Sequence, residues 1–334
     1  MQSKAPQGNK LAVLKALKQG EFVSGQELGQ ALGISRAAIA KHIASLQDMG
    51  IDIFTVNGKG YRLNHALPLL HEEHIHHYAQ QAGFALAALE VVQILDSTNS
   101  ELMRRIQQGT PPQSGHVLVA EMQQAGRGRR GRQWQSPFGA NLYYSYYWRL
   151  DDGMQAAMGV SIAVGLAVYD ALKQLYGLQV QLKWPNDIYL NGRKLAGILV
   201  ELDGLVEGPC HLVIGIGLNV AMPEPSALQI DQPWCDLQGA VGKVDKNQLV
   251  AVLSGCLSER LAQYRQSGLT QMSAQWNRLN AFAGTLVTLS TGQRSWSGSC
   301  EGIDNQGALL LRQDGEVKAF YGGELSLRAT STQD

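Results

Sequence analysis

Residues 126–134 read GRGRRGRQW, and residues 141–148, a few positions later, read NLYYSYYW. The first six letters match the GxGxxG pattern of dinucleotide-binding folds, in which a helix directly after the glycines holds the pyrophosphate. Here a proline-containing segment and an aromatic, β-rich strand follow instead, and arginines replace the small residues that let backbone amides approach a phosphate. The stretch therefore predicts a mobile cationic loop that folds over a phosphate or carboxylate, with an exposed basic turn as the alternative.

The segments on both sides of this loop alternate between strand-like and helical patterns. Such alternation predicts an α/β domain built on a mixed sheet. We expect strands near residues 89–95, 115–122, 141–150, 179–184, 188–190, 194–202 and 211–220, and helices near residues 99–108, 154–175, 247–265 and 269–279.

The composition is that of a soluble, packed protein, because 45% of the 334 residues are apolar and 17% are charged. The longest apolar stretch, residues 154–169, is shorter than the roughly 18 to 20 residues that span a bilayer, so it predicts a buried helix and no membrane association. In the absence of a basic, apolar leader, the expected location is the cytoplasm. The four cysteines lack CxxC pairing, which argues against a zinc site and a disulfide framework.

The first 65 residues predict a winged helix-turn-helix domain. Helices are expected at residues 10–18, 24–32 and 35–49, and a β-hairpin at residues 51–63. This segment holds eight Lys or Arg residues against four Asp or Glu, whereas the remainder holds 20 against 24. The asymmetry predicts that only the first part meets a polyanion.

The third predicted helix has the layout of a recognition helix, because Ile39, Ile43 and Leu46 share the face that packs inward. The outward residues are small or basic: Arg36, Ala37, Ala40, Lys41 and Ser45. Small side chains allow close approach to base edges, and basic ones contact phosphates. The predicted DNA contacts are Arg36, Ala37, Lys41 and Lys59, with Arg62 beside them. A protein-docking module is the alternative, and useful DNA specificity requires two copies, hence a dimer.

The remaining segments set the predicted domain limits. Residues 64–70 hold a proline and no clear period, so the first boundary is placed after residue 65. The histidine-rich run at 71–77 lacks HExxH spacing and is interpreted as a solvated helix start, so no metal site is predicted. Beyond Gly284, short strands separated by turns predict a small β-barrel. The predicted domains are residues 1–65, 66–283 and 284–334.

Taken together, the motifs resemble those of the biotin protein ligases, specifically the bifunctional kind that also represses biotin synthesis. They occur in the family's order and spacing, and with the terminal modules they cover nearly the whole chain. Gln133 departs from the pattern, since relatives often carry a basic residue there. The matching motifs are Ser97-Thr98-Asn99, QQAGRGRRGRQW at 123–134, SPFGAN at 136–141, KWPND at 183–187, RKLAGIL at 193–199 and GIGLN at 215–219.

The resemblance implies a class II synthetase-like catalytic domain, an SH3-like C-terminal barrel and a two-step reaction. Biotin and ATP, with Mg²⁺, give biotinyl-5′-AMP and pyrophosphate. A lysine of the biotin carboxyl carrier protein of acetyl-CoA carboxylase then attacks the mixed anhydride. We further expect the adenylate to act as corepressor, because its binding orders the loops, favours a homodimer and pairs two winged helices on operator DNA.

The residue types suit biotin. Its uncharged ureido ring needs neutral hydrogen-bonding partners, and glycines admit the ring against bare backbone. The implied biotin contacts are Ser97, Thr98, Asn99, Gln123, Gly126, Arg127, Gly128, Arg129, Lys194, Gly215 and Gly217. Structural roles are open for some of the same positions, since residues 97–99 can cap a helix and residues 185–187 can form a turn.

Cations must offset the repulsion between the biotin carboxylate and ATP. The implied catalytic residues are Arg129, Lys183, Asp187 and Lys194, and the implied ATP or adenylate contacts are Arg129, Arg132, Lys183, Asn186, Asp187, Asn219 and Trp234. Asp187 either accepts the proton of the carrier lysine or fixes the adenylate and Mg²⁺, and the sequence leaves both open. The alternatives are a ligand-sensing DNA-binding regulator without catalysis and a lipoate ligase, which the GRGRRG loop with KWPND disfavours.

Overall fold

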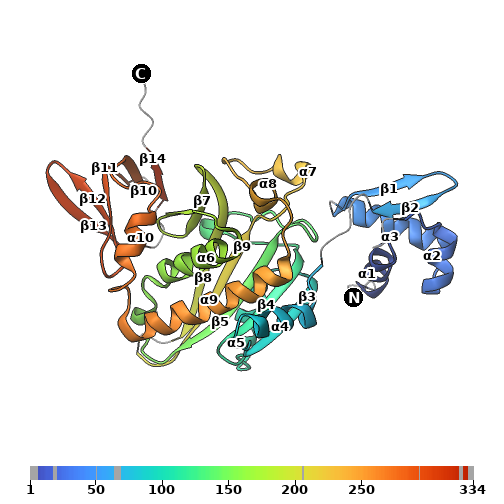
Figure 1. Ribbon diagram of the computed structural model, residues 1–334, viewed down its shortest axis with the longest axis horizontal. Coiled ribbons are helices and arrows are strands. Elements are labelled where there is room, and N and C mark those ends of the chain that lie inside the picture. Colours follow the sequence, from blue (N-terminus) through green and yellow to red (C-terminus); the bar gives the residue numbers. More distant parts are fainter. Residues whose placement is uncertain are drawn as a thin grey trace, which may run out of the picture.

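The protein has three structural parts in this computed structural model, which describes residues 7–17, 21–49, 51–63, 69–204, 207–292, 294–322 and 326–329. The N-terminal and C-terminal parts lie at opposite ends of a larger central part (Figure 1). The predicted first domain boundary, after residue 65, lies outside the described residues, and the second, after residue 283, stays a prediction.

The N-terminal part forms the predicted winged helix-turn-helix. Its elements are α1 (Gln7–Ala16), α2 (Gly25–Leu32), α3 (Arg36–Asp48), β1 (Ile53–Val56) and β2 (Gly60–Leu63). Ser24 and Glu27 cap α2 reciprocally, because Ser24 Oγ accepts from the Glu27 N–H at 3.1 Å and the Glu27 carboxylate accepts from the Ser24 N–H at 2.9 Å. Ile39, Ile43 and Leu46 are buried, so the predicted inward face of α3 is confirmed.

The central part is built on a seven-stranded mixed sheet with the order β3-β4-β5-β9-β8-β7-β6. Strands β3 and β4 are parallel, and the other neighbours are antiparallel. The strands are β3 (Ala88–Leu95), β4 (His116–Gln123), β5 (Leu142–Leu150), β6 (Gln181–Lys183), β7 (Asp187–Leu190), β8 (Arg193–Gly204) and β9 (Cys210–Leu218). The mixed sheet predicted from the alternating pattern is confirmed.

Helices cover the two faces of this sheet unequally. They are α4 (Glu72–Gln81), α5 (Thr98–Gln107), α6 (Val160–Tyr176), α7 (Glu224–Ala227), α8 (Leu237–Val241), α9 (Lys246–Ser267) and α10 (Ser273–Leu279), with 3-10 turns at Arg129–Gly131 and Met154–Ala157. Helices α6 and α9 pack together on one face in the main hydrophobic core, whereas α5 packs on part of the other. The second face is therefore only partly covered.

Alternation along β9 separates these two faces. Ile214 and Ile216 belong to the core with α6 and α9, whereas Val213 packs against α5. Gly215 and Gly217 share the face of Val213 and place no side chain on it. The sheet surface beyond α5 is therefore left open, and this open stretch forms the floor of the cavity described below.

Helix α6 begins later than predicted. A 3-10 turn over Met154–Ala157 and a left-handed Gly159 with φ 85° precede it, so the predicted continuous helix over 154–175 is wrong at its start. The segment Met154–Tyr176 is also long and apolar enough to cross a membrane, contrary to the predicted shortfall in length. However, 67% of its most apolar window is buried inside the protein. It is a core helix, as the sequence predicted.

An ion pair between Glu121 and Lys246 lies inside the central part, with both side chains 0% exposed. Lys246 Nζ lies 2.8 Å from Glu121 Oε2 and donates to Gly139 O at 2.9 Å. The other Glu121 oxygen accepts from the Leu70 N–H. The pair therefore connects the first described residues of the central part to β4, to α9 and to the segment that follows the arginine loop (residues 126–134).

The C-terminal part is a five-stranded antiparallel sheet with the order β13-β12-β11-β10-β14, which confirms the predicted strands. They are β10 (Leu286–Thr291), β11 (Arg294–Ile303), β12 (Leu309–Gln313), β13 (Glu316–Phe320) and β14 (Ser326–Ala329). Val287 and Leu309 are buried in the same core as the central part. The Trp184 indole N–H donates to Gly307 O at 3.0 Å and fixes this sheet beside the KWPND segment.

We predict that Lys246→Met destabilises the protein by about 3–5 kcal/mol, because Glu121 is left as a buried, unpaired charge. The double variant Glu121→Gln/Lys246→Met removes both charges and should recover most of that loss. Urea unfolding followed by circular dichroism measures the free energy of unfolding. An equal loss in the single and double variants would contradict this account of the pair.

Candidate active site and nucleic-acid interface

A cavity of about 410 Å³ lies over the open stretch of the central sheet. Its wall comes from the start of α5, the end of β4, the arginine loop, the β6–β7 turn and strands β8 and β9, with β14 of the C-terminal sheet at its edge. Most predicted site residues line it. They are Ser97, Thr98, Asn99, Gln123, Arg127, Gly128, Arg129, Arg132, Lys183, Asn186, Asp187, Lys194, Gly215 and Gly217.

One end of the cavity holds an uncharged hydrogen-bond network. Gln123 Oε1 accepts from the Thr98 N–H at 2.9 Å and from Thr98 Oγ1 at 3.1 Å, and Gln123 Nε2 donates to Ser136 Oγ at 3.3 Å. Buried Ser145 Oγ lies 2.7 Å from Thr98 Oγ1 and 2.6 Å from Asn99 Oδ1. Because these side chains hold one another, this end offers a fixed, neutral set of polar groups.

Gly215 and Gly217 make room for protein side chains at this end. A Cβ at Gly215 would lie 2.4 Å from Asn99 Oδ1, and a Cβ at Gly217 would lie 2.4 Å from the Trp134 ring. Asn99 and Trp134 thus occupy the space in front of these glycines, where we expected a ligand ring, and ligand contacts at the glycines stay predictions. The Trp134 Nε1 atom is buried and has no hydrogen-bond partner in the described part of the chain, so the indole brings an unused donor to the wall.

The arginine loop folds back on itself as a narrow hairpin. Gly126 O accepts from the Trp134 N–H at 2.9 Å, and the Gly128 N–H donates to Arg132 O at 2.7 Å. Arg130 at the tip has φ 60°, an uncommon conformation for a residue other than glycine. A 3-10 turn follows the first glycines, not the helix that a dinucleotide-binding motif requires, so the rejection of a Rossmann fold is confirmed. The mobility of the loop stays a prediction.

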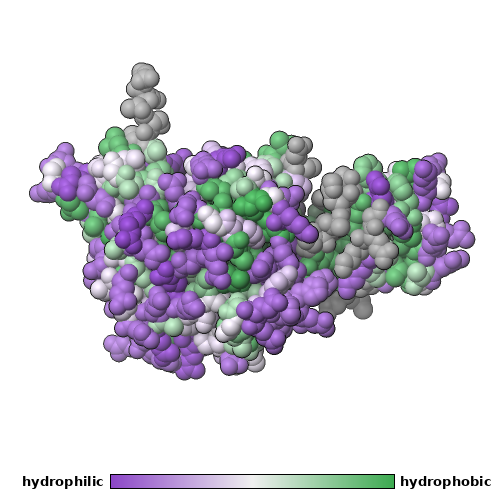
Figure 2. All heavy atoms as spheres, in the orientation of Figure 1, coloured by the Kyte–Doolittle hydropathy of each residue, from purple (hydrophilic) through white to green (hydrophobic). Residues whose placement is uncertain are grey.

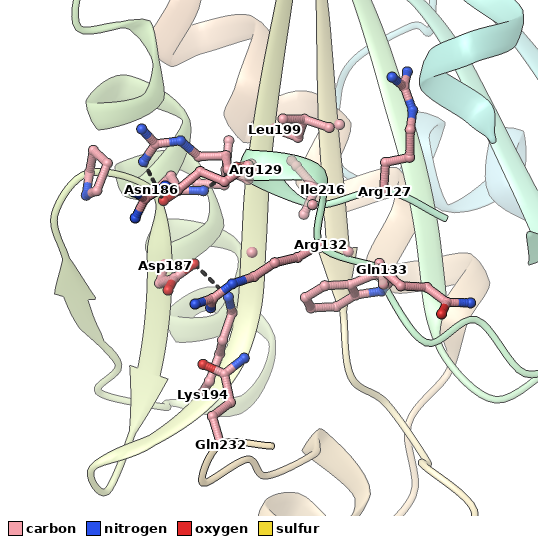
Figure 3. A pocket seen from close by; sticks show the side chains of 18 of the residues that line it. Arg127, Arg129, Arg132, Gln133, Asn186, Asp187, Lys194, Leu199, Ile216 and Gln232 are labelled. Carbon is pink, nitrogen blue, oxygen red and sulfur yellow. Dashed lines mark hydrogen bonds and ion pairs between the residues drawn. The ribbon is translucent and has the colours of Figure 1, made fainter. Parts of the chain in front are cut away.

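The other end of the cavity collects positive charge. Arg129 Nη1 donates to Asn186 Oδ1 at 3.1 Å, and Lys194 Nζ lies 2.7 Å from Asp187 Oδ1. Figure 3 shows Arg129 directed at Asn186, and Arg132 extended toward Asp187 and Lys194. Burial is the main cause that lowers the pKa of Arg129 from its ordinary value. This guanidinium is therefore held as a cation at a cost that a nearby anion would reduce.

Lys183 also lies buried near the other cations of the cavity wall. Burial is the largest cause that lowers the pKa of its ammonium group. The Asp187 carboxylate opposes that shift, whereas Lys194, Arg328 and Arg132 add to it by repulsion. Positive charge therefore exceeds negative charge around Lys183, and an anionic ligand would restore the balance.

Arg127 does not join this cluster. Its guanidinium points away from the other labelled cations in Figure 3. Its Nη2 atom lies 3.0 Å from Glu201 Oε1 on β8, and the two side chains form an ion pair. The Arg127 guanidinium is therefore separate from the cationic cluster, although the side chains of Arg127 and Arg129 both line the cavity.

Three predicted site residues lie outside the cavity wall. Gly126 is packed in the base of the arginine loop, where no space is left for a Cβ. Asn219 is buried, and its Nδ2 donates to Cys235 O at 3.1 Å. Trp234 forms a β-bridge with Lys194, next to wall residues 231–233. Their ligand contacts stay predictions.

Two of the motifs also have the structural roles that the sequence left open, a helix cap and a turn. Ser97 caps α5, where its Oγ accepts from the Ser100 N–H at 3.4 Å. Asn186 lies in the turn between β6 and β7, and its Nδ2 donates to Ile198 O at 2.6 Å. These residues therefore shape the backbone and also line the cavity.

Sequence reasoning missed several side chains that complete the site. Tyr189 accepts a hydrogen bond from Lys183 Nζ at 3.0 Å, and burial raises the pKa of its hydroxyl to about 12. Arg328 reaches the cavity from β14, and no local pattern marks it. Ser145 could have been predicted from the sequence, because it is the one small hydroxyl residue in the aromatic run NLYYSYYW.

The arrangement suits a ligand with one uncharged polar end and one strongly anionic end. Asp187 and Asp231 are the carboxylates of the wall. Within the described ranges, no group of three or more His, Cys, Asp and Glu side chains is placed to hold a metal ion. The histidine-rich run forms the first turns of α4.

The N-terminal part presents the predicted DNA contacts to solvent. The exposed residues are Arg36, Ala37, Lys41 and Lys59. Two other residues differ from the expectation: Ser45 Oγ accepts from Lys10 Nζ at 2.7 Å, and Arg62 lies over the rings of Phe22 and Phe54 at 5.0 and 5.3 Å. These two therefore support the domain itself. Hydrophilic residues cover the end of this part that lies furthest from the central part (Figure 2).

Three protein families match successive parts of the chain. The HTH domain matches residues 9–62, the biotin/lipoate A/B protein ligase family matches residues 91–219, and the biotin protein ligase C terminal domain matches residues 284–328. These matches fall in the N-terminal, central and C-terminal parts of the fold.

Similar proteins match over most of their length. The bifunctional ligase/repressor BirA of Salmonella typhimurium is 47% identical over 96% of this chain and 97% of its own. The protein of the same name from Escherichia coli is 46% identical over the same shares. Among solved structures, the biotin protein ligase of Aquifex aeolicus in complex with biotin and ATP is 28% identical with a TM-score of 0.61, covering 73% of this chain and 100% of that one.

We predict that inorganic pyrophosphate binds the cationic end of the cavity, and that Lys183→Met raises its dissociation constant about 10-fold because one converging cation is lost. Lys243→Met is the matched control, since Lys243 is exposed and does not line the cavity. Isothermal titration calorimetry measures both constants. Equal affinities in the two variants would show that pyrophosphate binds elsewhere.

The same titration should depend on pH. Burial lowers the pKa of Lys183, so its ammonium group loses the proton at a lower pH than an exposed lysine does. Pyrophosphate affinity should therefore fall as the pH rises through the alkaline range below the ordinary lysine value. Lys183→Arg keeps its charge at these pH values and should flatten the profile. Superimposable profiles for the two proteins would rule out Lys183 as the titrating group.

Proposed function

The chain belongs to the family of bifunctional biotin protein ligases that also act as repressors, and we propose that its cavity joins biotin to ATP and passes the biotinyl group to a carrier lysine. The proposal rests on the difference between the two ends of the cavity, one neutral and one cationic. The neutral network around Gln123 suits the uncharged ureido ring, and the cations at the other end suit the carboxylate and the triphosphate. The chain is thus a biotin–[acetyl-CoA-carboxylase] ligase.

In the first step, a carboxylate oxygen of biotin attacks the α-phosphorus of ATP. The bond to the bridging oxygen of the β-phosphate breaks, and pyrophosphate leaves. Both reactants are anions, so Arg129, Lys183 and Lys194 offset their repulsion and stabilise the charge that grows on the transferring phosphorus. These side chains act from partly buried positions, where electrostatic interactions are stronger than in water.

In the second step, the neutral amine of the carrier lysine attacks the carbonyl carbon of the adenylate, and AMP leaves. The new amide nitrogen releases one proton, which we assign to Asp187, the carboxylate next to Lys194. Mg²⁺, when bound, adds positive charge at the phosphates, which would supply most of its ligands, and Asp231 is the wall carboxylate left to contact it. We also assign Trp234 to the adenine, because it adjoins wall residue Pro233.

The repressor activity belongs to the N-terminal domain, which we assign to residues 1–65. Arg36, Ala37 and Lys41 on α3 face the major groove of the operator in this proposal, and Lys59 at the hairpin tip contacts the backbone. The adenylate is the corepressor, and it favours a homodimer that presents two such domains. The partners are the carrier protein and operator DNA, and the reaction takes place in the cytoplasm.

A regulator without catalysis and a lipoate ligase are the competing functions. The first is disfavoured because Arg129, Lys183, Asp187 and Lys194 line one cavity together. The second is disfavoured by the 46–47% identity with the ligase/repressors. Neither accounts as well for a cavity that is neutral at one end and cationic at the other.

Biotin-dependent exchange of labelled pyrophosphate into ATP tests the ligase directly. Biotin should support exchange and lipoate should not, whereas a regulator without catalysis would show none. The double variant Arg129→Met/Lys194→Met should lose about 100-fold or more of the exchange rate, because two charges at the reacting phosphorus are removed. Lys243→Met should behave as the wild type. Full-speed exchange in the double variant would overturn the assigned roles.

Sedimentation velocity with and without biotinyl-5′-AMP tests the corepressor role. The adenylate should raise the dimer fraction and tighten operator binding. Lys59→Ala should weaken DNA binding and reduce the slope of log affinity against log salt by about 2 for the dimer, because each of its two domains loses one phosphate contact. If the adenylate left the monomer fraction unchanged, the proposed coupling between adenylate binding and dimerisation would be wrong.

A further inference from the structure

Glu201 lies where the neutral network meets the arginine loop. Its Oε2 atom accepts from Asn99 Nδ2 at 2.8 Å. On its other side, Oε1 and Oε2 accept from Arg127 Nη2 at 3.0 and 3.1 Å. We propose that Glu201 is a positioning residue that orients Asn99, anchors the base of the arginine loop through Arg127, and thereby sets the affinity for biotin. This inference rests on the proposed function.

The amide of Asn99 is hydrogen-bonded on all sides within the protein. Its Nδ2 group has two hydrogens, and these meet Glu201 Oε2 at 2.8 Å and Leu199 O at 3.1 Å. Its Oδ1 atom accepts from Ser145 Oγ at 2.6 Å and fills the space in front of Gly215. Both donors of Asn99 are thus committed within the protein. Asn99 forms a fixed wall of the cavity and does not donate to a ligand.

A carboxylate at position 201 is what fixes the orientation of that amide. An ionised carboxylate only accepts hydrogen bonds, so it selects the orientation in which Nδ2 faces β8. In the flipped amide, Oδ1 would face two acceptors, the Glu201 carboxylate and Leu199 O. The Ser145 hydroxyl would lose one of its two acceptors at the same time and keep only Thr98 Oγ1. The orientation of Asn99 therefore affects the Ser145 hydroxyl, and Ser145 in turn contacts Thr98 in the neutral network.

Arg127 lies at the base of the loop hairpin. Its backbone forms a β-bridge with Gln133 on the opposite side of that hairpin. Anchoring Arg127 to β8 therefore holds both sides of the base. Nearer the tip, Arg129 contacts Asn186 at 3.1 Å. The loop thus lies between two anchors, one on β8 and one in the KWPND segment, with the cavity between them.

Arg127 also neutralises Glu201. The Glu201 side chain is 23% exposed, so an unpaired carboxylate there would place a negative charge beside the path of anionic reactants. The ion pair removes that repulsion and satisfies the carboxylate. Removing Arg127 alone should therefore harm the site more than removing both charges together.

Steady-state pyrophosphate exchange with varied biotin tests the proposal on the full chain. Glu201→Leu removes both contacts and should raise the KM for biotin about 10-fold, with a much smaller change in kcat. Glu201→Gln keeps an acceptor for Asn99 and should raise the KM only about 2–3-fold. Glu207→Gln, at an exposed glutamate in the turn between β8 and β9, is the control and should match the wild type. A KM that is equal in all four proteins would overturn the proposal.

A double-mutant cycle of Arg127→Met and Glu201→Gln gives a second test, which holds even where Glu201→Leu fails to fold. The effects on the KM should be non-additive, and the double variant should bind biotin more tightly than Arg127→Met alone. Additive effects would refute a shared role for the pair. Absence of exchange in the wild type would instead refute the ligase function, so the two failures are distinguishable.

Discussion

The burial of mutually repelling cations in one cavity wall is the constraint on which the site depends. The cavity wall brings together side chains from four separate parts of the chain: Arg129, Arg132, Lys183, Lys194 and Arg328. Asp187 forms a direct ion pair with Lys194. Burial lowers the pKa of Arg129 and Lys183, which reflects the cost of holding these charges away from water. In the proposed function, anionic reactants relieve that repulsion, so the fold supplies binding and transition-state stabilisation in advance.

The apolar core and one buried ion pair hold these charges in place. Helices α6 and α9 fill one face of the central sheet, so strands β7, β8 and β9 form a rigid base for the cavity. On the other face, glycines replace bulky side chains and let Asn99 and Trp134 approach the backbone. The Glu121–Lys246 pair fixes Gly139, just beyond the arginine loop. Residues that do not contact the reactants therefore help to preorganise the site.

The catalytic and DNA-binding parts share physical contacts. Phe138, four residues beyond the arginine loop, is buried in the same hydrophobic cluster as Leu14 and Leu46 of the winged helix-turn-helix. The Leu70 N–H, just after the segment between the two parts, donates to Glu121 on β4. The segment that follows the arginine loop and the winged helix-turn-helix therefore pack in one hydrophobic cluster.

Local patterns in the sequence were sufficient for most of the elements. The resemblance to the biotin protein ligases, rather than a local pattern, assigned the cationic residues of GRGRRGRQW and KWPND to a site. The spacing of Ile39, Ile43 and Leu46 predicted the inward face of α3, and the alternating pattern predicted the mixed sheet. These features depend on neighbours in the chain, through helical period, capping and turn formation. They are therefore readable without a structure. The same local rules misplaced the start of α6, because the conformation of Gly159 is set by its packing.

Only the tertiary structure decided how distant residues combine. It placed Arg127 in an ion pair with Glu201, away from the other cations. It also placed Asn99 in the space in front of Gly215, and Arg328 of the last strand at the cavity. Each of these contacts joins residues far apart in the chain. Their distances follow from sheet register and from the packing of one part on another, which no local pattern encodes.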